Sequence, residues 1–83
     1  MKTNELKKGA QVLLRNGWKA TIEDNMRGNI RMCTVYGDYT EMGSVYAHDI
    51  VARQSGIQWM HDIELTKSQQ QCMDINQKLG LGH

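Results

Sequence analysis

The chain has 83 residues with a formal net charge of +1, and 23% of its residues are charged. This length predicts a single domain, residues 1–83, built around one modest core. The charge total indicates neither a strongly basic nucleic-acid binder nor an acidic mimic of nucleic acid, and no apolar run approaches the ~20 residues that a membrane span needs.

The strongest structural signal is the dipeptide Asn16-Gly17, which lies between two strand-like runs in residues 6–24. A two-residue loop would pair Arg15 with Trp18 and turn two of the apolar side chains toward water. A three-residue loop, residues 15–17, collects five apolar side chains on one core face: Val12, Leu14, Trp18, Ala20 and Ile22. Because a slip of one residue reverses every side chain, the pattern selects the three-residue loop. We predict a type I turn with Asn16 right-handed, followed by Gly17 at positive φ in a G1 bulge.

Three further strands are expected, over residues 30–36, 44–48 and 57–60. The first alternates imperfectly, which indicates either a bulge or two half-buried faces. Segments 25–29 and 37–43 are rich in turn residues and predict loops. Residues 49–51 either continue the second of these strands or begin a bend. Cys33 and Cys72 have no motif spacing, so we expect two small buried hydrophobes, with a disulfide between them as the alternative.

A helix is predicted over residues 66–79. Thr66 at the N-cap and Gln69 three residues later form the pattern of a capping box, and Gly80 is a stop signal. The apolar residues of the helix form a narrow stripe, which we expect to face the sheet or a partner: Cys72, Met73, Ile75 and Leu79.

Five short strands joined by tight turns and followed by a helix are typical of a small half-open barrel. The segment LKKGAQVLLRNGWKATI, residues 6–22, also resembles the KOW-type opening of SH3-like barrels, in which a glycine precedes the first strand as Gly9 does here. The glycine that is usual in the second KOW strand is absent from the run Lys19-Ala20-Thr21. The expected fold is mostly β (β+α), a small SH3-like five-stranded half-open barrel over residues 6–60 followed by one C-terminal helix.

The chain also resembles small accessory proteins encoded by tailed phages and prophages, on the segments LRNGWKATIEDN and TEMGSVYAHDI. This resemblance implies no defined activity. It leads to the first functional hypothesis, a non-enzymatic accessory factor that binds a host protein. Residues 1–20 lack the apolar core of a signal peptide, so we expect a cytoplasmic protein, in the host cell if a phage encodes it.

Exposed aromatic and methionine side chains are the candidates for binding that partner. The predicted partner-binding residues are Met26, Arg27, Tyr36, Tyr39, Met42 and Tyr46. Met26 and Met42 fall in predicted loops, and methionine adapts well at interfaces. Tyr36 and Tyr46 would lie across neighbouring strands, either as a stacking platform for single-stranded nucleic acid or as a pair that only stabilises the sheet. Trp18 and Trp59 are expected in the core, because the chain has no phenylalanine.

Charge is unevenly distributed. Residues 1–31 hold seven Lys or Arg against three Asp or Glu, whereas residues 32–65 hold one against five. Once the strands interleave, this gives either an ordinary mixed surface or a basic face, and it is compatible with a homodimer. The alternative function is therefore an SH3-like nucleic-acid-binding module that contacts phosphates through Arg15, Lys19, Arg27 and Arg31.

A metal-dependent hydrolase of the HD type is the weaker alternative, because His-Asp occurs at residues 48–49 and 61–62. In an extended strand the two side chains of each pair would point to opposite faces. We therefore expect Asp49 and Asp62 to make turn or cap hydrogen bonds instead. No nucleophile motif or phosphate loop is present. We expect no catalysis, no metal and no cofactor.

Overall fold

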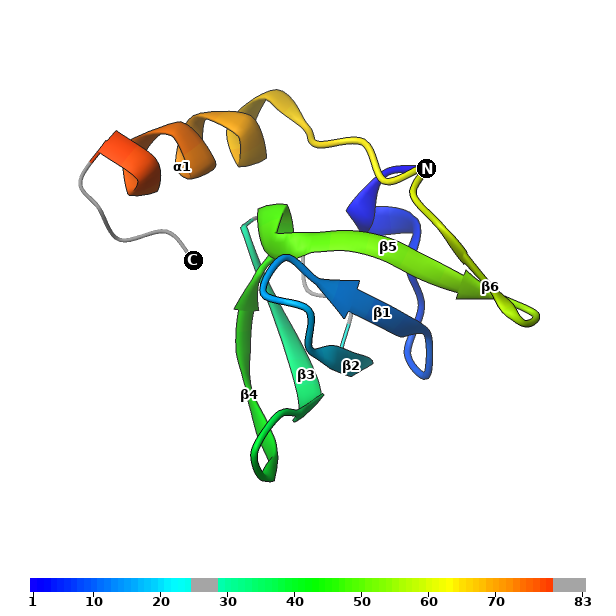
Figure 1. The fold of residues 1–83 in the computed structure, drawn as a ribbon. Coiled ribbons are helices and arrows are strands. Elements are labelled where there is room, and N and C mark those ends of the chain that lie inside the picture. Colours follow the sequence, from blue (N-terminus) through cyan, green and yellow to red (C-terminus); the bar gives the residue numbers. More distant parts are fainter. Residues whose placement is uncertain (25–28, 79–83) are drawn as a thin grey trace.

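The structure is a computed structural model that describes residues 1–24 and 29–78. Its strands form one open antiparallel sheet in the order β4-β3-β2-β1-β5-β6, with a helix across one end (Figure 1). The elements in chain order are the 3₁₀ turn η1 (Thr3–Glu5), β1 (Gln11–Leu14), β2 (Lys19–Asp24), β3 (Ile30–Tyr36), β4 (Thr40–Tyr46), the 3₁₀ turn η2 (Ala47–Asp49), β5 (Ile50–Ser55), β6 (Gln58–Met60) and α1 (Lys67–Lys78). The prediction of a mostly β fold with one C-terminal helix is confirmed. The described residues form six strands, not the predicted five, and the sheet is not closed.

The first hairpin has the predicted register. Val12 pairs with Ala20, and the amide of Leu14 donates to the carbonyl of Trp18 at 2.8 Å. Gly17 has φ +92°, and no described residue other than glycine has positive φ. The three-residue loop is therefore confirmed, because the alternative type I′ turn would require positive φ at two positions.

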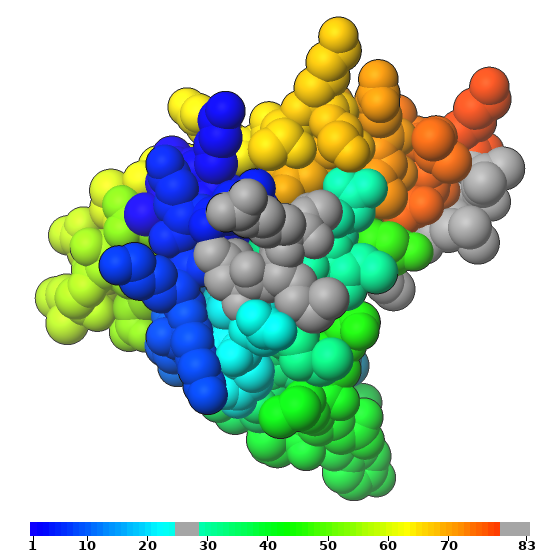
Figure 2. Space-filling view, turned by 180° about the vertical axis from the view of Figure 1, so that it is seen from behind, coloured from blue at the N-terminus to red at the C-terminus, as the bar shows by residue number. Residues whose placement is uncertain are grey.

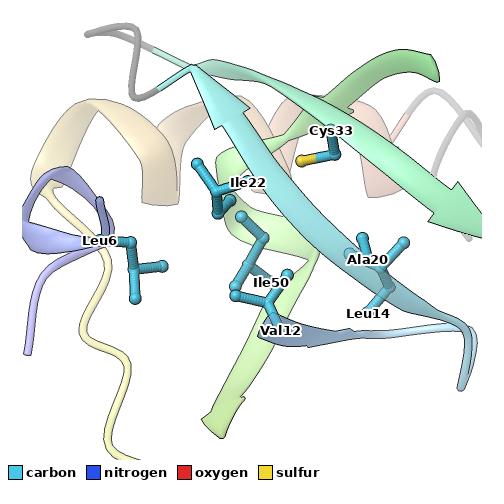
Figure 3. Packing of buried hydrophobic residues seen from close by; sticks show 7 residues of the cluster. All are labelled: Leu6, Val12, Leu14, Ala20, Ile22, Cys33 and Ile50. Atoms are coloured by element: carbon cyan, nitrogen blue, oxygen red, sulfur yellow. The ribbon is translucent and has the colours of Figure 1, made fainter. Parts of the chain in front are cut away.

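The core lies on the face that this register predicts. Its buried residues come from the N-terminal segment and from four strands, and they are Leu6, Val12, Leu14, Ala20, Ile22, Cys33 and Ile50 (Figure 3). Trp18 is 43% exposed, so its predicted place in the core is wrong. An added Cβ on Gly37 would come within 2.4 Å of the indole, so the ring lies directly against the Gly37 backbone, outside the buried cluster. Trp59 is half-buried in β6.

Two segments of the middle of the chain differ from the prediction. The expected loop 37–43 contains only a tight turn at 37–39, closed by the Gly37 amide donating to the Tyr39 carbonyl at 3.2 Å, and β4 begins at Thr40. Gly43 suggested a loop but lies inside this strand, where it offers no side chain to pack. The predicted strand 44–48 is thus displaced. Residues 49–51 were expected to continue that strand or to begin a bend, but residues 50–55 form the separate strand β5 between β1 and β6. The bulge near β3 lies in the partner strand, between Ile22 and Asp24.

The predicted capping box of the helix is confirmed. The amide of Gln69 donates to the Thr66 hydroxyl at 3.2 Å, and the amide of Thr66 donates to the Gln69 side chain at 3.0 Å. The expected apolar face is wrong, because α1 buries the polar residues Gln69 and Asn76 and leaves Ile75 57% exposed. Leu79 and Gly80 lie outside the described residues.

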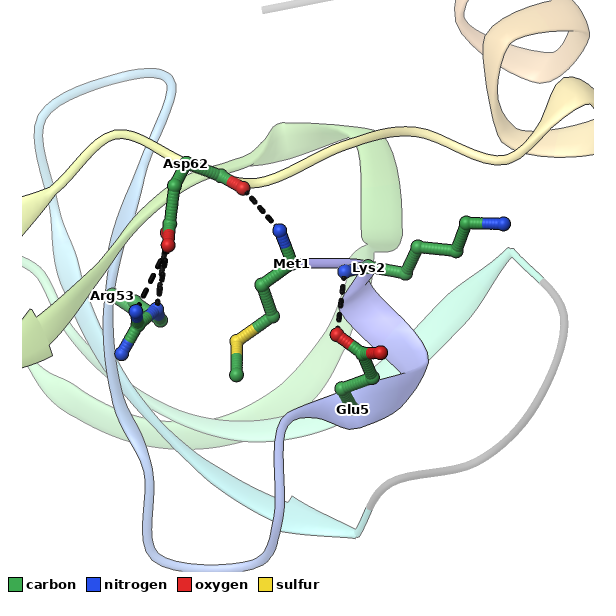
Figure 4. Close-up of polar contacts among 5 residues, drawn as sticks. All are labelled: Met1, Lys2, Glu5, Arg53 and Asp62. Carbon is green, nitrogen blue, oxygen red and sulfur yellow. Dashed lines mark hydrogen bonds and ion pairs between the residues drawn. The ribbon is translucent and has the colours of Figure 1, made fainter.

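The N-terminus is joined to the segment that follows β6 (Figure 4). The Met1 ammonium donates to the Asp62 carbonyl at 2.6 Å, and the Glu64 amide donates to the Met1 carbonyl at 2.7 Å. The Asp62 carboxylate accepts from the guanidinium of Arg53 in β5 at 2.9 Å. Because this hydrogen bond favours the charged carboxylate, it lowers the pKa of Asp62 and raises that of Arg53.

Candidate functional site at the edge of strand β4

Strand β4 forms one edge of the sheet and is paired only with β3 among the described residues. Its seven residues pair in unbroken register from Thr40 to Tyr46, with no bulge. The opposite edge strand, β6, has only three residues. Edge strands are usually protected by proline, lysine, bulges or shortness. Strand β4, TEMGSVY, has none of these features and contains one charged residue, Glu41.

The hydrogen-bond pattern shows which backbone groups of β4 face outward. The Ala47 amide donates to the Asn29 carbonyl, and the Gly37 amide donates to the Tyr39 carbonyl. Directly opposed residues of an antiparallel pair alternate between bonded and non-bonded pairs, so the odd-numbered residues of β4 bond to β3. The amides and carbonyls of the even-numbered residues therefore point away from the sheet, and these are Thr40, Met42, Ser44 and Tyr46.

Two adjoining hollows lie along the inner face of this edge. The larger, of about 400 Å³, is lined by apolar side chains that include Leu14, Val45 and Tyr46. The smaller, of about 210 Å³, is lined by Tyr39, Glu41 and Met42 among others. Trp18 and Val35 line both hollows. We call these two hollows together with β4 the edge groove.

The charged residues that line the larger hollow, Arg15 and Asp49, are already paired with each other. The Arg15 guanidinium donates to Oδ1 of Asp49 at 3.3 Å and to the His48 carbonyl at 2.7 Å. Nε2 of His48 lies 3.6 Å from the same Asp49 oxygen, and its ring stacks on Tyr46 with centroids 4.9 Å apart. Both His48 and Asp49 are buried. This cluster joins the first hairpin turn to η2, and its members Arg15 and Asp49 line part of the larger hollow.

At the other end of the groove, the tip of the β3–β4 hairpin stands out from the body of the molecule (Figure 2). Tyr39 at this tip is 78% exposed and Met42 is 66% exposed. No ion pair links Glu41 or Asp38 to a cation in the part of the chain that the structure describes. This end of the groove is therefore aromatic, exposed and acidic.

The predicted partner-binding residues are only partly brought together. Tyr39 and Met42 both line the smaller hollow, although Met42 lies in β4 and not in the predicted loop. Tyr36 pairs with Thr40 and Tyr46 pairs with Ile30, at opposite ends of the β3–β4 ladder, so the predicted stacking platform is not formed. The Tyr36 hydroxyl instead lies 2.8 Å from the Thr21 hydroxyl. Met26 and Arg27 lie outside the described residues.

The predicted phosphate-binding residues do not form a basic surface. Arg31 is fully buried, so its prediction as a phosphate contact is wrong for this structure. Its guanidinium donates to the Asn4 side chain and to the Ile30 carbonyl, and burial lowers its pKa. Arg15 is paired with Asp49, Arg27 lies outside the described residues, and Lys19 is exposed.

The His-Asp pairs behave differently from the prediction. His48 and Asp49 lie in η2, not in a strand, so their side chains come together and do not separate to opposite faces. Asp49 and Asp62 each pair with an arginine, although turn or cap hydrogen bonds were expected. Within residues 1–24 and 29–78, no three His, Cys, Asp or Glu side chains are placed to hold a metal ion.

Both cysteines are free thiols. Cys33 is buried, as predicted, and burial is the main reason that its pKa is raised to about 11. A thiol with this pKa stays protonated near neutral pH and is a poor nucleophile. Cys72 is only half-buried, on α1.

Sequence reasoning missed most residues of the edge groove, among them Trp18, Glu41 and Val45. Trp18 shares the face of Val12 and Ile22, which predicts a core position, but periodicity does not distinguish the centre of a face from its margin. The glycines on either side of Glu41 predict a loop at that position. Gly37 was the available signal, since an antiparallel partner without a side chain leaves room for a large ring.

No helix in the described ranges is long and apolar enough to cross a membrane. No protein-family model matches the chain, and neither a curated protein nor a solved structure shows significant similarity to it.

Proposed function

We propose that this chain is a non-enzymatic protein-binding module that accepts an extended segment of a partner protein along the outer edge of β4. The observation that supports the proposal most directly is the edge itself, seven residues in unbroken register with the backbone groups of every second residue facing outward. Addition of a strand to such an edge is a recurring mode of peptide recognition, in which backbone hydrogen bonds supply affinity and side-chain pockets supply specificity.

The hollows beside β4 supply those pockets. Leu14, Val35 and Val45 offer apolar surface in the larger hollow, and Trp18 and Tyr39 offer aromatic rings in the smaller one. Aromatic residues are enriched where proteins bind one another, because they bury a large area at low entropic cost. Tyr39 and Met42, proposed from the sequence as partner-binding residues, belong to this surface.

We propose as the biological setting that the chain is an accessory protein of a phage or prophage and that the partner is a host protein. An SH3-like arrangement is likewise a proposal. It is supported by the path of the chain, in which β2, β3 and β4 follow β1 as a meander and β5 returns through η2 to pair with β1.

A library of random peptides, selected on the immobilised protein, tests the proposal. Selected peptides should shift the backbone amide NMR signals of Thr40, Met42 and Ser44, and Ser44→Pro should abolish their binding. Proline removes an outward amide that the β3–β4 ladder does not use, so the sheet should persist, which circular dichroism checks. Ile57→Ser is the control, since Ile57 is fully exposed near the other edge and its loss should not change binding.

A second experiment modifies the peptide and leaves the protein unchanged. Methylating alternate backbone nitrogens of a selected peptide should weaken binding in one register and not in the other, because only every second amide of an added strand faces β4. Failure to enrich any peptide over a protein-free support, or binding that is insensitive both to Ser44→Pro and to methylation, would overturn the proposal.

A further inference from the structure

The side chains on the inner face of β4 differ along the strand in a way that would select particular side chains in a bound segment. Glu41 lines the smaller hollow and Val45 lines the larger one, on the same face of β4 and four residues apart. Between them stands Gly43, around which an added Cβ would meet nothing within 4 Å. The edge groove therefore presents an acidic position, an open position and an apolar position in sequence.

We propose that the preferred ligand is an extended segment that carries an aliphatic residue and, four residues later, a lysine or arginine. The inference rests on the proposed strand addition. All strand pairs of the described sheet are antiparallel, and antiparallel pairing is the more stable form, so an added strand should run antiparallel to β4. Such a strand meets Val45 first, Gly43 next and Glu41 last.

The pairing geometry brings these side chains close together. The outward amides of the even-numbered residues form the bonded pairs, so Glu41, Gly43 and Val45 stand at non-bonded pairs, where opposed side chains are nearest. Opposed Cβ atoms in such pairs lie ~4.5–5.5 Å apart, within range for an ion pair. The residue opposite Gly43 meets no side chain from that position of β4.

Two features of the edge groove attract the lysine or arginine of the ligand that lies opposite Glu41. Glu41 is exposed and has no ion-pair partner among the described residues, and Asp38 at the hairpin tip adds to the negative potential. Trp18 and Tyr39 line the same hollow, and a cation over an indole or phenol face is attracted by the ring quadrupole. An acidic residue at this position would face Glu41 directly and be repelled.

The aliphatic residue of the ligand lies opposite Val45 and is received by the larger hollow. Leu14, Val35 and Val45 provide its apolar wall, and Tyr46 is held beside it by stacking on His48. Arg15 and Asp49 at its end already neutralise each other, so they do not favour a charged occupant. An isoleucine or valine is of a size that suits both the hollow and an extended backbone.

Synthetic peptides test this directly by calorimetric titration. The probe is an extended peptide of alternating threonine and serine in which one isoleucine precedes one lysine by four residues. We expect it to bind about tenfold more tightly than the same peptide with glutamate in place of lysine, since an opposed ion pair and a cation–π contact each contribute part of that factor. Replacing the isoleucine by alanine should also weaken binding.

A charge exchange supplies the decisive comparison. Glu41→Lys should reverse the preference, so that the glutamate peptide binds this variant more tightly than the lysine peptide does. Asp74→Lys is the matched control, because it makes the same change in net charge from an exposed position on α1 and should leave the preference unaltered. Quenching or shift of Trp18 fluorescence in a Trp59→Phe background gives a second readout, since the chain has two tryptophans.

The outcomes separate this inference from the proposed function. If the lysine and glutamate peptides bind equally and Ser44→Pro abolishes both, strand addition stands and the inference is overturned. If binding is insensitive both to Ser44→Pro and to methylation of the peptide backbone, strand addition and the inference are both overturned. If sedimentation without peptide shows self-association that Ser44→Pro removes, the edge is occupied by a second copy of the chain, and the inference is again overturned. The inference is also overturned if a peptide with lysine before isoleucine binds as tightly.

Discussion

At the scale of residues, two glycines have different structural roles. Gly17 and Gly43 are both glycines in or beside β strands, but their backbone requirements differ. Gly17 has φ +92°, a region that costs residues with a side chain about 1 to 2 kcal/mol. Gly43 has no positive φ, and the space around it is open. The first glycine is thus required by backbone geometry, whereas the second only keeps the edge groove unobstructed.

This difference predicts opposite effects of the same substitution. Gly17→Ala should lower the free energy of unfolding by about 1 to 2 kcal/mol, because alanine must adopt a left-handed conformation. Gly43→Ala should leave the free energy unchanged or raise it by up to about 1 kcal/mol, because alanine restricts the unfolded chain. Urea titrations of both variants give the comparison, and equal destabilisation by both would contradict it.

At the scale of elements, the N-terminal segment and the segment that follows β6 contact each other, although they are far apart in sequence. Met1 and Lys2 lie beside residues 62–64, with an isolated parallel bridge between Lys2 and Glu64. The Arg53–Asp62 pair fixes the same segment to β5. Both side chains of the pair remain partly accessible to solvent. This pair therefore makes a modest contribution to stability that depends on pH.

The sign of that dependence follows from the lowered pKa of Asp62. A carboxyl whose folded-state pKa lies below its unfolded value stabilises the fold above the unfolded pKa, about 4 for Asp. The stabilisation is lost as the pH falls through the lower folded pKa. Asp62→Asn should therefore be less stable than the natural chain near neutral pH, and the difference should vanish in strong acid. Urea midpoints measured across this range test the prediction, and a difference independent of pH would contradict it.

At the scale of the whole molecule, burial is uneven. Val12, Ala20 and Ile22 are fully buried in β1 and β2, whereas α1 buries two polar residues and exposes Ile75. The helix is attached through specific polar contacts, such as the hydrogen bond that the Arg15 guanidinium donates to the thioether Sδ of Met73 at 3.3 Å. Apolar burial supplies most of the free energy that resists local opening.

Amide hydrogen exchange should reveal this gradient. The amides of β1 and β2 should exchange only through global unfolding, while those of α1 should exchange through a smaller opening at lower free energy. Thr66→Ala should speed exchange in α1 by removing its cap, at a cost of about 1 kcal/mol, and Thr66→Ser should not. Equal protection of α1 and β1 in the natural chain would show that the helix is an integral part of the core.

The sequence alone determined the features that depend on neighbouring residues. The loop at Gly17, the register of β1 and β2 and the capping box of Thr66 and Gln69 each follow from local backbone geometry or from a short periodic pattern. The tertiary structure alone decided which residues are exposed. Arg31 was predicted on the surface and is buried beside Asn4, and Trp18 was predicted in the core and lies over Gly37 at the groove. It also decided that β4 is an edge, because a strand is an edge only when no other segment pairs with it, and that depends on the whole chain.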